Sequence, residues 1–404
     1  MSRATILVGF AEALAAPEVV WSLVDAGFHV VAFARKGRAS ALRYSRHVEC
    51  QEICSPESDL QAAISDLHSL LISLSPLVGD GQCILLPLDD KALYLSSRVE
   101  LGSGWILAGP HGANADLALN KHLQIEAARH AGFKVPTTRL ARTAQDIFDF
   151  ATAESFPIIL KAAECVPVYQ GRVHSSRNWI CANLGELERA VSQWAERAPL
   201  LVQTFIAGTG EGVFGLAAPE GIRAWSAHRR LRMMNPEGSG SSACISQPVS
   251  DDLKDKVQAL MTAAEWRGLF MIELLRDHSG TSWFVELNGR SWGSMALSRR
   301  QGLEYPAWHV KLAIDPGSGI GETLPLAPGV VCRNVGRELI HVLFVLRGAR
   351  STALSNGPSL WKTLVDVIRV RREDTFYNWR ADDPKVFFAD CYYTIHDNLF
   401  KSRN

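Results

Sequence analysis

The sequence has no surplus of charge of either sign. Its 42 lysine and arginine residues balance 42 aspartate and glutamate residues in a chain of 404. Proteins that bind nucleic acid or anionic membrane surfaces usually carry a basic patch that shifts this balance. We therefore expect no nucleic acid among the partners, and small molecules instead.

Paired cysteines, membrane-length apolar runs and a glycine-rich dinucleotide motif are also missing. The eight cysteines are scattered, and the one close pair, Cys50 and Cys54, has no second pair at zinc-site spacing. We expect reduced thiols in a cytoplasmic protein. No apolar run reaches the length of a membrane span without a charge, so we expect no membrane-spanning segment. Only Gly9 lies near the first strand-to-helix turn, which argues against a dinucleotide site.

The first hundred residues have the pattern of an open α/β sheet. An apolar run at 5–10, a helical pattern at 16–27 and a second apolar run at 28–35 predict a doubly wound parallel sheet. A later strand ends in Asp89 and Asp90, where such sheets usually contact ligands. A solvated loop after the strand is the alternative for these two acids.

From residue 113 onward the pattern changes to mixed helices and strands. We expect a helix ending at Gly132, a strand at 156–163 that carries Lys161, a helix at 185–197, strands at 199–208 and 222–234, a Gly/Ser-rich loop at 235–242 and a helix at 251–266.

Basic residues on two of these strands each allow two interpretations. Lys161 either emerges at the strand edge and reaches water or supplies a point charge for a phosphate. His228, Arg230 and Arg232 share one strand face, as a solvated basic face or as cations near a ligand. The loop that follows either approaches an anion or connects a hairpin.

The most informative stretch is "LFMIELLRDHSGTSWFVELNGR", a predicted β-hairpin with acids inside its apolar strands. Strand periodicity places Glu286, Asn288 and Arg290 on one face, with Glu273 on the partner strand. Two carboxylates and a carboxamide are hard oxygen ligands that suit Mg²⁺. The alternative is that the acids form salt bridges with Arg276, Arg290 and Arg299.

The order of these features resembles the ATP-grasp superfamily, and in particular its carboxylate-amine ligases, with a more distant likeness to biotin carboxylase and D-alanine ligases. The resemblance implies three parts: an α/β pre-ATP-grasp domain at 1–112, an ATP-grasp domain at 113–315, and a mainly helical C-terminal extension at 316–404. The middle part would divide into a small lid subdomain at about 135–205 and a metal-binding, catalytic subdomain at about 206–315.

The resemblance also implies roles for individual residues. ATP would contact Lys121, Lys161, Gln203, Thr204, Phe205, Ile206 and Glu211; the metal would bind Glu273, Glu286 and Asn288; and the catalytic cations would be Arg290 and Arg230.

The implied activity joins a carboxylate to an amine, with an amino-acid or peptide-like substrate, and releases ADP and phosphate. It uses ATP with Mg²⁺ or Mn²⁺, and an acyl phosphate is the intermediate. Where the family usually has a glycine-rich phosphate flap, residues 162–176 contain only Gly171. Carboxylation or phosphorylation of a small metabolite, or ATP sensing without turnover, are therefore retained as alternatives. A homodimer is the assembly we consider first, because two-fold pairs are the commonest oligomers.

Overall fold

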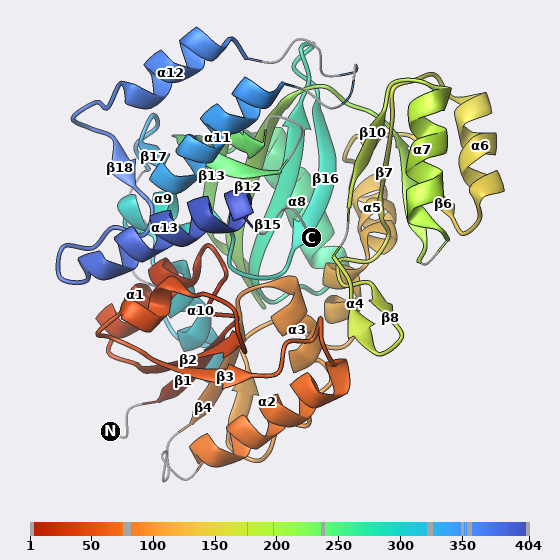
Figure 1. Cartoon of the computed structure of the whole chain (residues 1–404). Helices are drawn as coiled ribbons and strands as arrows, with labels where there is room; N and C mark the ends of the chain where they lie inside the picture. The colour runs from red at the N-terminus through yellow and green to blue at the C-terminus, as the bar shows by residue number, and fades with distance from the viewer. Residues whose placement is uncertain are drawn as a thin grey trace.

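The computed structural model describes most of the chain. The described residues are 4–75, 82–175, 177–196, 198–235, 239–320, 326–348, 351, 353 and 358–400. They form an N-terminal α/β unit, a four-stranded sheet with two helices, a large seven-stranded sheet and a C-terminal group of helices (Figure 1).

The N-terminal unit is a five-stranded parallel sheet in the order β3-β2-β1-β4-β5. Its strands are β1 (Thr5–Gly9), β2 (His29–Arg35), β3 (Glu49–Ile53), β4 (Cys83–Pro87) and β5 (Trp105–Leu107). Its helices are α1 (Ala16–Asp25), the 3₁₀ helix η1 (Ala41–Tyr44), α2 (Leu60–Leu74) and α3 (Asp90–Ser96). The expected strand–helix–strand opening is confirmed.

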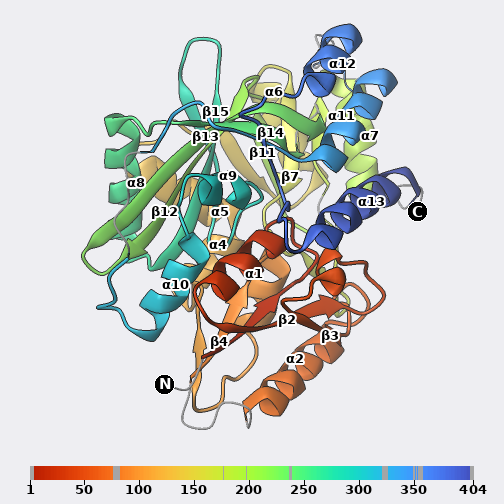
Figure 2. The same cartoon turned by 90° about the vertical axis from the view of Figure 1, so that its left-hand side faces the viewer.

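Helices cover both faces of this sheet because its strands are apolar on both sides. Ile6 and Val8 pack on the α1 side, whereas Leu7 packs with α2 on the other side. The α1 side continues into the core of the large sheet through α10 (Tyr305–Ile314). Figure 2 shows α1 and α10 between the two sheets. The carboxyl ends of β1 and β4 therefore point toward the rest of the molecule.

The four-stranded sheet is antiparallel, in the order β10-β7-β11-β6. Its strands are β6 (Thr138–Ala141), β7 (Ile158–Ala162), β10 (Trp179–Cys181) and β11 (Leu200–Thr204). Two helices, α6 (Ala144–Ala153) and α7 (Leu184–Trp194), cover one face. The helices α4 (Ala113–Leu119) and α5 (Lys121–His130) precede this unit. The start of α5 contacts both sheets, because Asn120 forms a β-bridge with Glu164 and Lys121 pairs with Glu286 on β16.

The large sheet has the order β16-β15-β12-β13-β14-β17-β18 and is antiparallel except at its last pair. Its strands are β12 (Thr209–Ala218), β13 (Gly221–Asn235), β14 (Ser239–Gln247), β15 (Gly268–Arg276), β16 (Ser282–Asn288), β17 (Val331–Arg333) and β18 (Thr375–Phe376). The helices α8 (Asp251–Ala263) and α9 (Met295–Arg300) pack against it. The predicted hairpin at 269–290 is thus the β15–β16 pair.

Two local predictions need correction. Ser239–Ser242 belong to β14 and pair with β13, so the Gly/Ser-rich segment is largely strand; residues 236–238 lie outside the described residues. β16 ends at Asn288, so Arg290 is not on its face. Gly289 follows at once, close to Trp266 and Pro110, where a side chain would collide with both.

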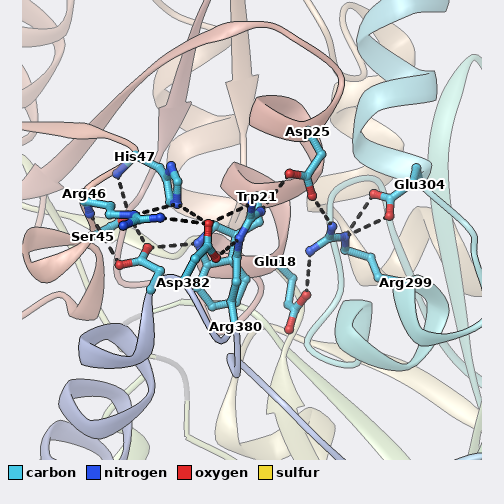
Figure 3. A network of polar contacts seen from close by, with 11 residues as sticks. Glu18, Trp21, Asp25, Ser45, Arg46, His47, Arg299, Glu304, Arg380 and Asp382 are labelled. Atoms are coloured by element: carbon cyan, nitrogen blue, oxygen red, sulfur yellow. Dashed lines mark hydrogen bonds and ion pairs between the residues drawn. The ribbon is translucent and has the colours of Figure 1, made fainter.

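The C-terminal part folds back over the large sheet as α11 (Val335–Arg347), α12 (Leu360–Ile368) and α13 (Pro384–Phe400), as the sequence predicts. Glu338 on α11 is buried and pairs with Arg232 on β13 and Arg333 on β17. Figure 3 shows a second network, in which Arg299 pairs with Glu18 and Asp25, and Asp25 also pairs with Arg380. These ion pairs attach the C-terminal helices to both larger units.

No helix among the described residues is both long enough and apolar enough to cross a lipid bilayer.

Candidate functional site

Two carboxylates face each other on the β15–β16 hairpin. Glu273 lies directly opposite Glu286, and the register shifts by one residue immediately after this pair. Like charges in this position repel, so each needs a compensating cation. Arg230 Nη2 lies 2.7 Å from Glu273 Oε1, and Lys121 Nζ lies 2.7 Å from Glu286 Oε2. The expected alternative partners, Arg276, Arg290 and Arg299, bind other acids.

Asn288 completes the predicted ligand set two residues beyond Glu286. Its buried amide Nδ2 donates to Glu286 Oε1 at 3.3 Å, so the amide and both carboxylates converge. In the described part of the chain, no group of three or more His, Cys, Asp or Glu side chains could hold a metal ion. The set of Glu273, Glu286 and Asn288 is not a group of that kind, because its third member is an amide. Three hard oxygen donors fit Mg²⁺ in chemistry.

Lys121 reaches this pair from the start of α5. The Asn120 side chain caps the helix by accepting from the backbone of His122 and Leu123, and Lys121 N donates to Ala163 O at the end of β7. Burial by itself lowers the pKa of Lys121, but the Glu286 carboxylate outweighs it and raises that pKa overall. Burial likewise opposes ionisation of Glu286, yet Lys121 and neighbouring cations lower its pKa to about 2. Both groups are charged at neutral pH.

Lys161 lies on β7 opposite Leu201 and is only 8% exposed. Its ammonium has no hydrogen bond or ion pair among the described residues. Burial, together with repulsion by Lys121, lowers its pKa to about 8, and the carboxylates Glu286 and Glu273 limit the fall. β7 is an inner strand of its sheet and the side chain is mostly buried, so Lys161 does not emerge at a strand edge. A largely buried lysine without a partner among the described residues is the arrangement expected of an anion site.

The basic strand is not a solvated face either. His228 and Arg230 are 2% and 9% exposed, while Arg229 points outward as alternation predicts. Arg230 needs the space that Gly210 leaves, because a side chain there would collide with it. Its Nε is buried without a partner among the described residues. Burial and the nearby Arg230 lower the pKa of His228 to about 3, so this imidazole is neutral.

Arg290 connects the hairpin to the N-terminal unit. Its Nε donates to Asp90 Oδ1 at 2.9 Å and its Nη2 to Asp90 Oδ2 at 3.2 Å. Asp89 caps α3 by accepting from Ala92 N and also pairs with Arg35. The acids after β4 are therefore structured groups at the interface of two units, and the alternative of a solvated loop is wrong.

The segment from Gln203 to Ile206 leaves the four-stranded sheet and enters the large one. Gln203 is 2% exposed and donates to Thr138 Oγ1 at 2.7 Å. The backbone of Thr204 donates to Thr137 O, and that of Phe205 donates to Pro157 O. Thr204, Phe205 and Ile206 are half-buried. This segment connects the two sheets.

Glu211 is not brought together with the other acids. It pairs in register with Leu274, whereas its neighbour Gly212 pairs with Glu273, so alternation places it on the other face of the sheet. It is 2% exposed and binds Arg276 Nε at 2.9 Å, with its second oxygen buried and unpartnered among the described residues.

The segment where a flap is expected is a short hairpin of β8 (Val168–Tyr169) and β9 (Arg172–Val173). Its two-residue turn needs positive φ at both positions, and Gln170 adopts it as well as Gly171. Leu60 N donates to Gly171 O, and Val173 N donates to Pro56 O. The hairpin is thus attached to the N-terminal unit.

Two cavities are lined by none of the residues of this cluster. One of about 520 Å³ is lined by Ala162 and Leu200, which face away from Lys161 on their strands, so it is not part of this site. The other, of about 220 Å³, is lined by Glu12 and Arg337 among others. Neither residue is expected at a site from the sequence. A charged residue in the first strand-to-helix loop was a usable signal for Glu12; Arg337 on an amphipathic helix offered none.

Comparisons with known proteins agree on architecture alone. No family model matches the chain, and no curated protein matches it in sequence. Solved structures do match, all at low identity.

Three examples illustrate the structural match. The biotin carboxylase domain of Hydrogenobacter thermophilus 2-oxoglutarate carboxylase, a dimer in complex with MgADP, ADP and bicarbonate, superposes with a TM-score of 0.61 at 16% identity, over 81% of this chain and 73% of that one. PurK, the N5-carboxyaminoimidazole ribonucleotide synthetase, in complex with ADP, gives 0.59 at 16% identity, over 86% and 85%. An L-amino acid ligase from Bacillus licheniformis gives 0.57 at 16% identity, over 80% and 78%.

Proposed function

Because the architecture that this chain shares with those enzymes is the ATP-grasp fold, we propose that it is a ligase that uses ATP and Mg²⁺ to join a carboxylate to an amine. The observation that carries the proposal is Lys161, a largely buried lysine whose ammonium has no partner among the described residues and lies near Lys121 and the facing pair Glu273 and Glu286. An anion with several oxygens, such as the phosphates of ATP, supplies what this ammonium lacks.

The groups proposed to bind the nucleotide lie near the segment from Gln203 to Ile206 that connects the two sheets. Lys121 and Lys161 would contact phosphate oxygens, and the backbone from Gln203 to Ile206 would border the adenine. Glu211 is kept as the ribose contact implied by the resemblance; its position on the opposite face makes it the weakest member of the set.

The metal would be held by Glu273, Glu286 and Asn288. Their oxygens converge at one end of the hairpin, and rigid strands hold ligands more precisely than loops do. When bound, Mg²⁺ would neutralise phosphate charge. Arg230 and Lys121 are paired with the two carboxylates in this structure. We expect both cations to turn toward the phosphates when nucleotide and metal bind.

The chemistry needs no nucleophilic side chain. A substrate carboxylate oxygen attacks the γ-phosphorus of ATP, and the bond from that phosphorus to the bridging β-phosphate oxygen breaks. The products of this step are ADP and an acyl phosphate. An amine nitrogen then attacks the acyl carbon, phosphate departs, and the nitrogen loses a proton. Arg230, Arg290 and Lys161 would stabilise the negative charge that develops on the transferred group. The β8–β9 hairpin would exclude water from the acyl phosphate.

ATP-dependent carboxylation is the second candidate, favoured by the bicarbonate in one similar structure. Bicarbonate would then replace the organic carboxylate, with the same cations around the transferred phosphoryl group. A dependence of ADP formation on added bicarbonate separates this activity from ligation.

The deciding experiment measures ADP formation by the purified protein with MgATP and pools of amino acids and small carboxylic acids, with mass spectrometry of the products. A product mass equal to two pool members minus water supports the ligase. ATP binding without ADP formation in any pool, with or without bicarbonate, contradicts both enzymatic proposals and favours a nucleotide sensor.

A further inference from the structure

The cavity of about 520 Å³ lies against the helix-covered face of the four-stranded sheet. Its floor is apolar and buried, and is formed by Ala162 on β7, Leu200 on β11 and Trp194 at the end of α7. Figure 1 shows α6 and α7 on the side of this sheet that faces away from the large sheet. Lys161 lies on the opposite face of β7, so the sheet separates this cavity from the proposed phosphate contact.

The end of α7 shapes one wall of the cavity. The helix stops at Trp194, and Ala195 and Glu196 then both adopt a φ of 52°, which turns the chain back toward β11. Trp194 Nε1 donates to Ala198 O at 2.7 Å. Because the indole N–H already has a partner, the ring offers apolar surface to a ligand and needs no polar group from it.

The remaining walls carry two further aromatic rings. Tyr169 belongs to β8, and Trp179 is the first residue of β10. Trp179 Nε1 donates to Gln193 Oε1 at 3.3 Å, so this indole N–H is also partnered. The volume falls within the ~300–1,000 Å³ typical of pockets for drug-sized ligands. The cavity is therefore large enough for a ligand with a ring, and aromatic side chains are there to pack against it.

The permanent charge on these walls is positive. Arg177 lies at the exposed rim, and no Asp or Glu lines the cavity in the described part of the chain. Arg177 Nη1 donates to Gln193 Oε1 at 2.8 Å, and the guanidinium carbon lies 5.6 Å from the centre of the Trp179 ring. Within the described ranges Arg177 forms no ion pair. A guanidinium has five N–H donors, so donors are left for an anion.

We propose that this cavity binds a small aromatic monoanion, whose ring packs against Trp179 and Trp194 and whose charge is bound by Arg177. A cationic ligand would meet no carboxylate among the described lining residues. A phosphorylated ligand would bring about two negative charges to a single guanidinium. The ligand is thus an effector bound apart from the proposed active site, and its binding does not depend on the proposed function.

Such a ligand would connect the β8–β9 hairpin to the four-stranded sheet. Tyr169 comes from the hairpin and His174 directly follows it, whereas Trp194 and Leu200 come from α7 and β11. Contacts with both sides would hold the hairpin in place. Because the hairpin is the segment proposed to exclude water from the acyl phosphate, occupancy should change the rate of ADP formation. This consequence, unlike binding itself, rests on the proposed function.

Calorimetry on the full chain tests binding without any turnover. Benzoate, phenylacetate and naphthoate are titrated, each beside its neutral amide. We expect at least one acid to bind, and its amide to bind about 10-fold more weakly, which corresponds to the loss of one charge-assisted contact. Binding should persist at saturating MgADP. Equal binding of acid and amide, or competition between the acid and MgADP, overturns the proposal.

Two variants locate the site. Arg177→Met should weaken binding of the acid about 10-fold, and Trp179→Leu about 3- to 10-fold through the loss of ring packing. The matched control is Arg189→Met, at an exposed arginine of α7 that does not line the cavity, and it should bind as the wild type does. No binding by any of the acids, or binding that both cavity variants leave intact, overturns the proposal.

The effector role is tested separately. ADP formation from MgATP is measured with and without a saturating concentration of the acid that binds, and an unchanged rate overturns this role. Failure of the proposed function would abolish ADP formation at any concentration of the acid and leave the calorimetric result intact, so the two failures are distinguished.

Discussion

Glu273 and Glu286 lie directly opposite each other on adjacent strands, and each is neutralised by a different cation, Arg230 and Lys121. Neither cation belongs to the hairpin. The two facing carboxylates are therefore compensated by cations from two other elements, Arg230 on β13 and Lys121 at the start of α5. This relationship underlies the first prediction.

Glu286→Gln should lower the rate of ADP formation by at least ~100-fold, because the amide keeps the shape of the side chain but not the charge needed at a metal. The variant should remain folded, since an amide oxygen still accepts a hydrogen bond from Lys121. ADP release and thermal melting check this. Glu126→Gln, an exposed acid on α5, is the control and should retain full activity. Full activity of Glu286→Gln contradicts the metal assignment.

The affinity for MgATP should fall as pH rises through about 8, the pKa to which burial lowers Lys161. Below that value the lysine is charged and attracts phosphate; above it the free protein must first take up a proton. Titrations between pH 7 and pH 10 measure the effect. Lys161→Arg, which stays charged throughout, should lose this dependence. An identical pH profile in the two proteins excludes Lys161 as the phosphate contact.

The stability of the fold should show the opposite trend with pH. The folded pKa of Lys161, about 8, lies below the ordinary value of 10.5, so the unfolded chain binds more protons between these values. Unfolding free energy therefore rises with pH across that window, by on the order of 3 kcal/mol if the group titrates alone. Urea denaturation of the wild type and Lys161→Met at several pH values isolates the contribution. The difference in unfolding free energy between the two proteins should change with pH. A difference that stays constant contradicts a buried Lys161 with a lowered pKa.

Asp90→Asn and Arg290→Met should be strongly coupled. Each removes one member of the two-point contact that joins the hairpin to the N-terminal unit, and the other then remains desolvated without its partner. A double-mutant cycle in urea should give a coupling energy of about 1–3 kcal/mol. Pairing Asp90→Asn with Arg229→Met, an exposed arginine, provides the control and should be additive within ~0.5 kcal/mol. Additivity of the first pair would mean that the contact contributes nothing in solution.

Glu338→Gln should destabilise the protein by about 3 kcal/mol, because the half-buried Arg232 would lose its carboxylate partner and the buried Arg333 would keep only Asp374. Glu373→Gln, at an exposed acid of the same region, should change stability by less than ~0.5 kcal/mol. Denaturation midpoints with unchanged slopes measure both. Equal effects of the two substitutions would show that the network on α11 does not attach the C-terminal helices.

Much of the local structure could be predicted from the sequence. The runs at 5–10 and 156–163 are strands because apolar side chains on both faces leave no solvated alternative. The hairpin at 269–290 follows from two such runs and a turn between them. The end of β16 at Asn288 could not be predicted, because the close approach of Gly289 to Trp266 and Pro110 arises only when distant segments pack together. The domain boundaries and the roles of the site residues stay predictions.

The sequence by itself determined which elements form and which chemical groups they carry: acids and an amide on a rigid hairpin, and lysines and arginines on nearby strands. Only the tertiary structure decided which groups meet. Lys121 reaches Glu286 across 165 residues, and Arg290 reaches Asp90 across 200. Local periodicity fixes the face on which a side chain lies, but the partner of a buried charge depends on the burial and desolvation that arise when distant segments pack together.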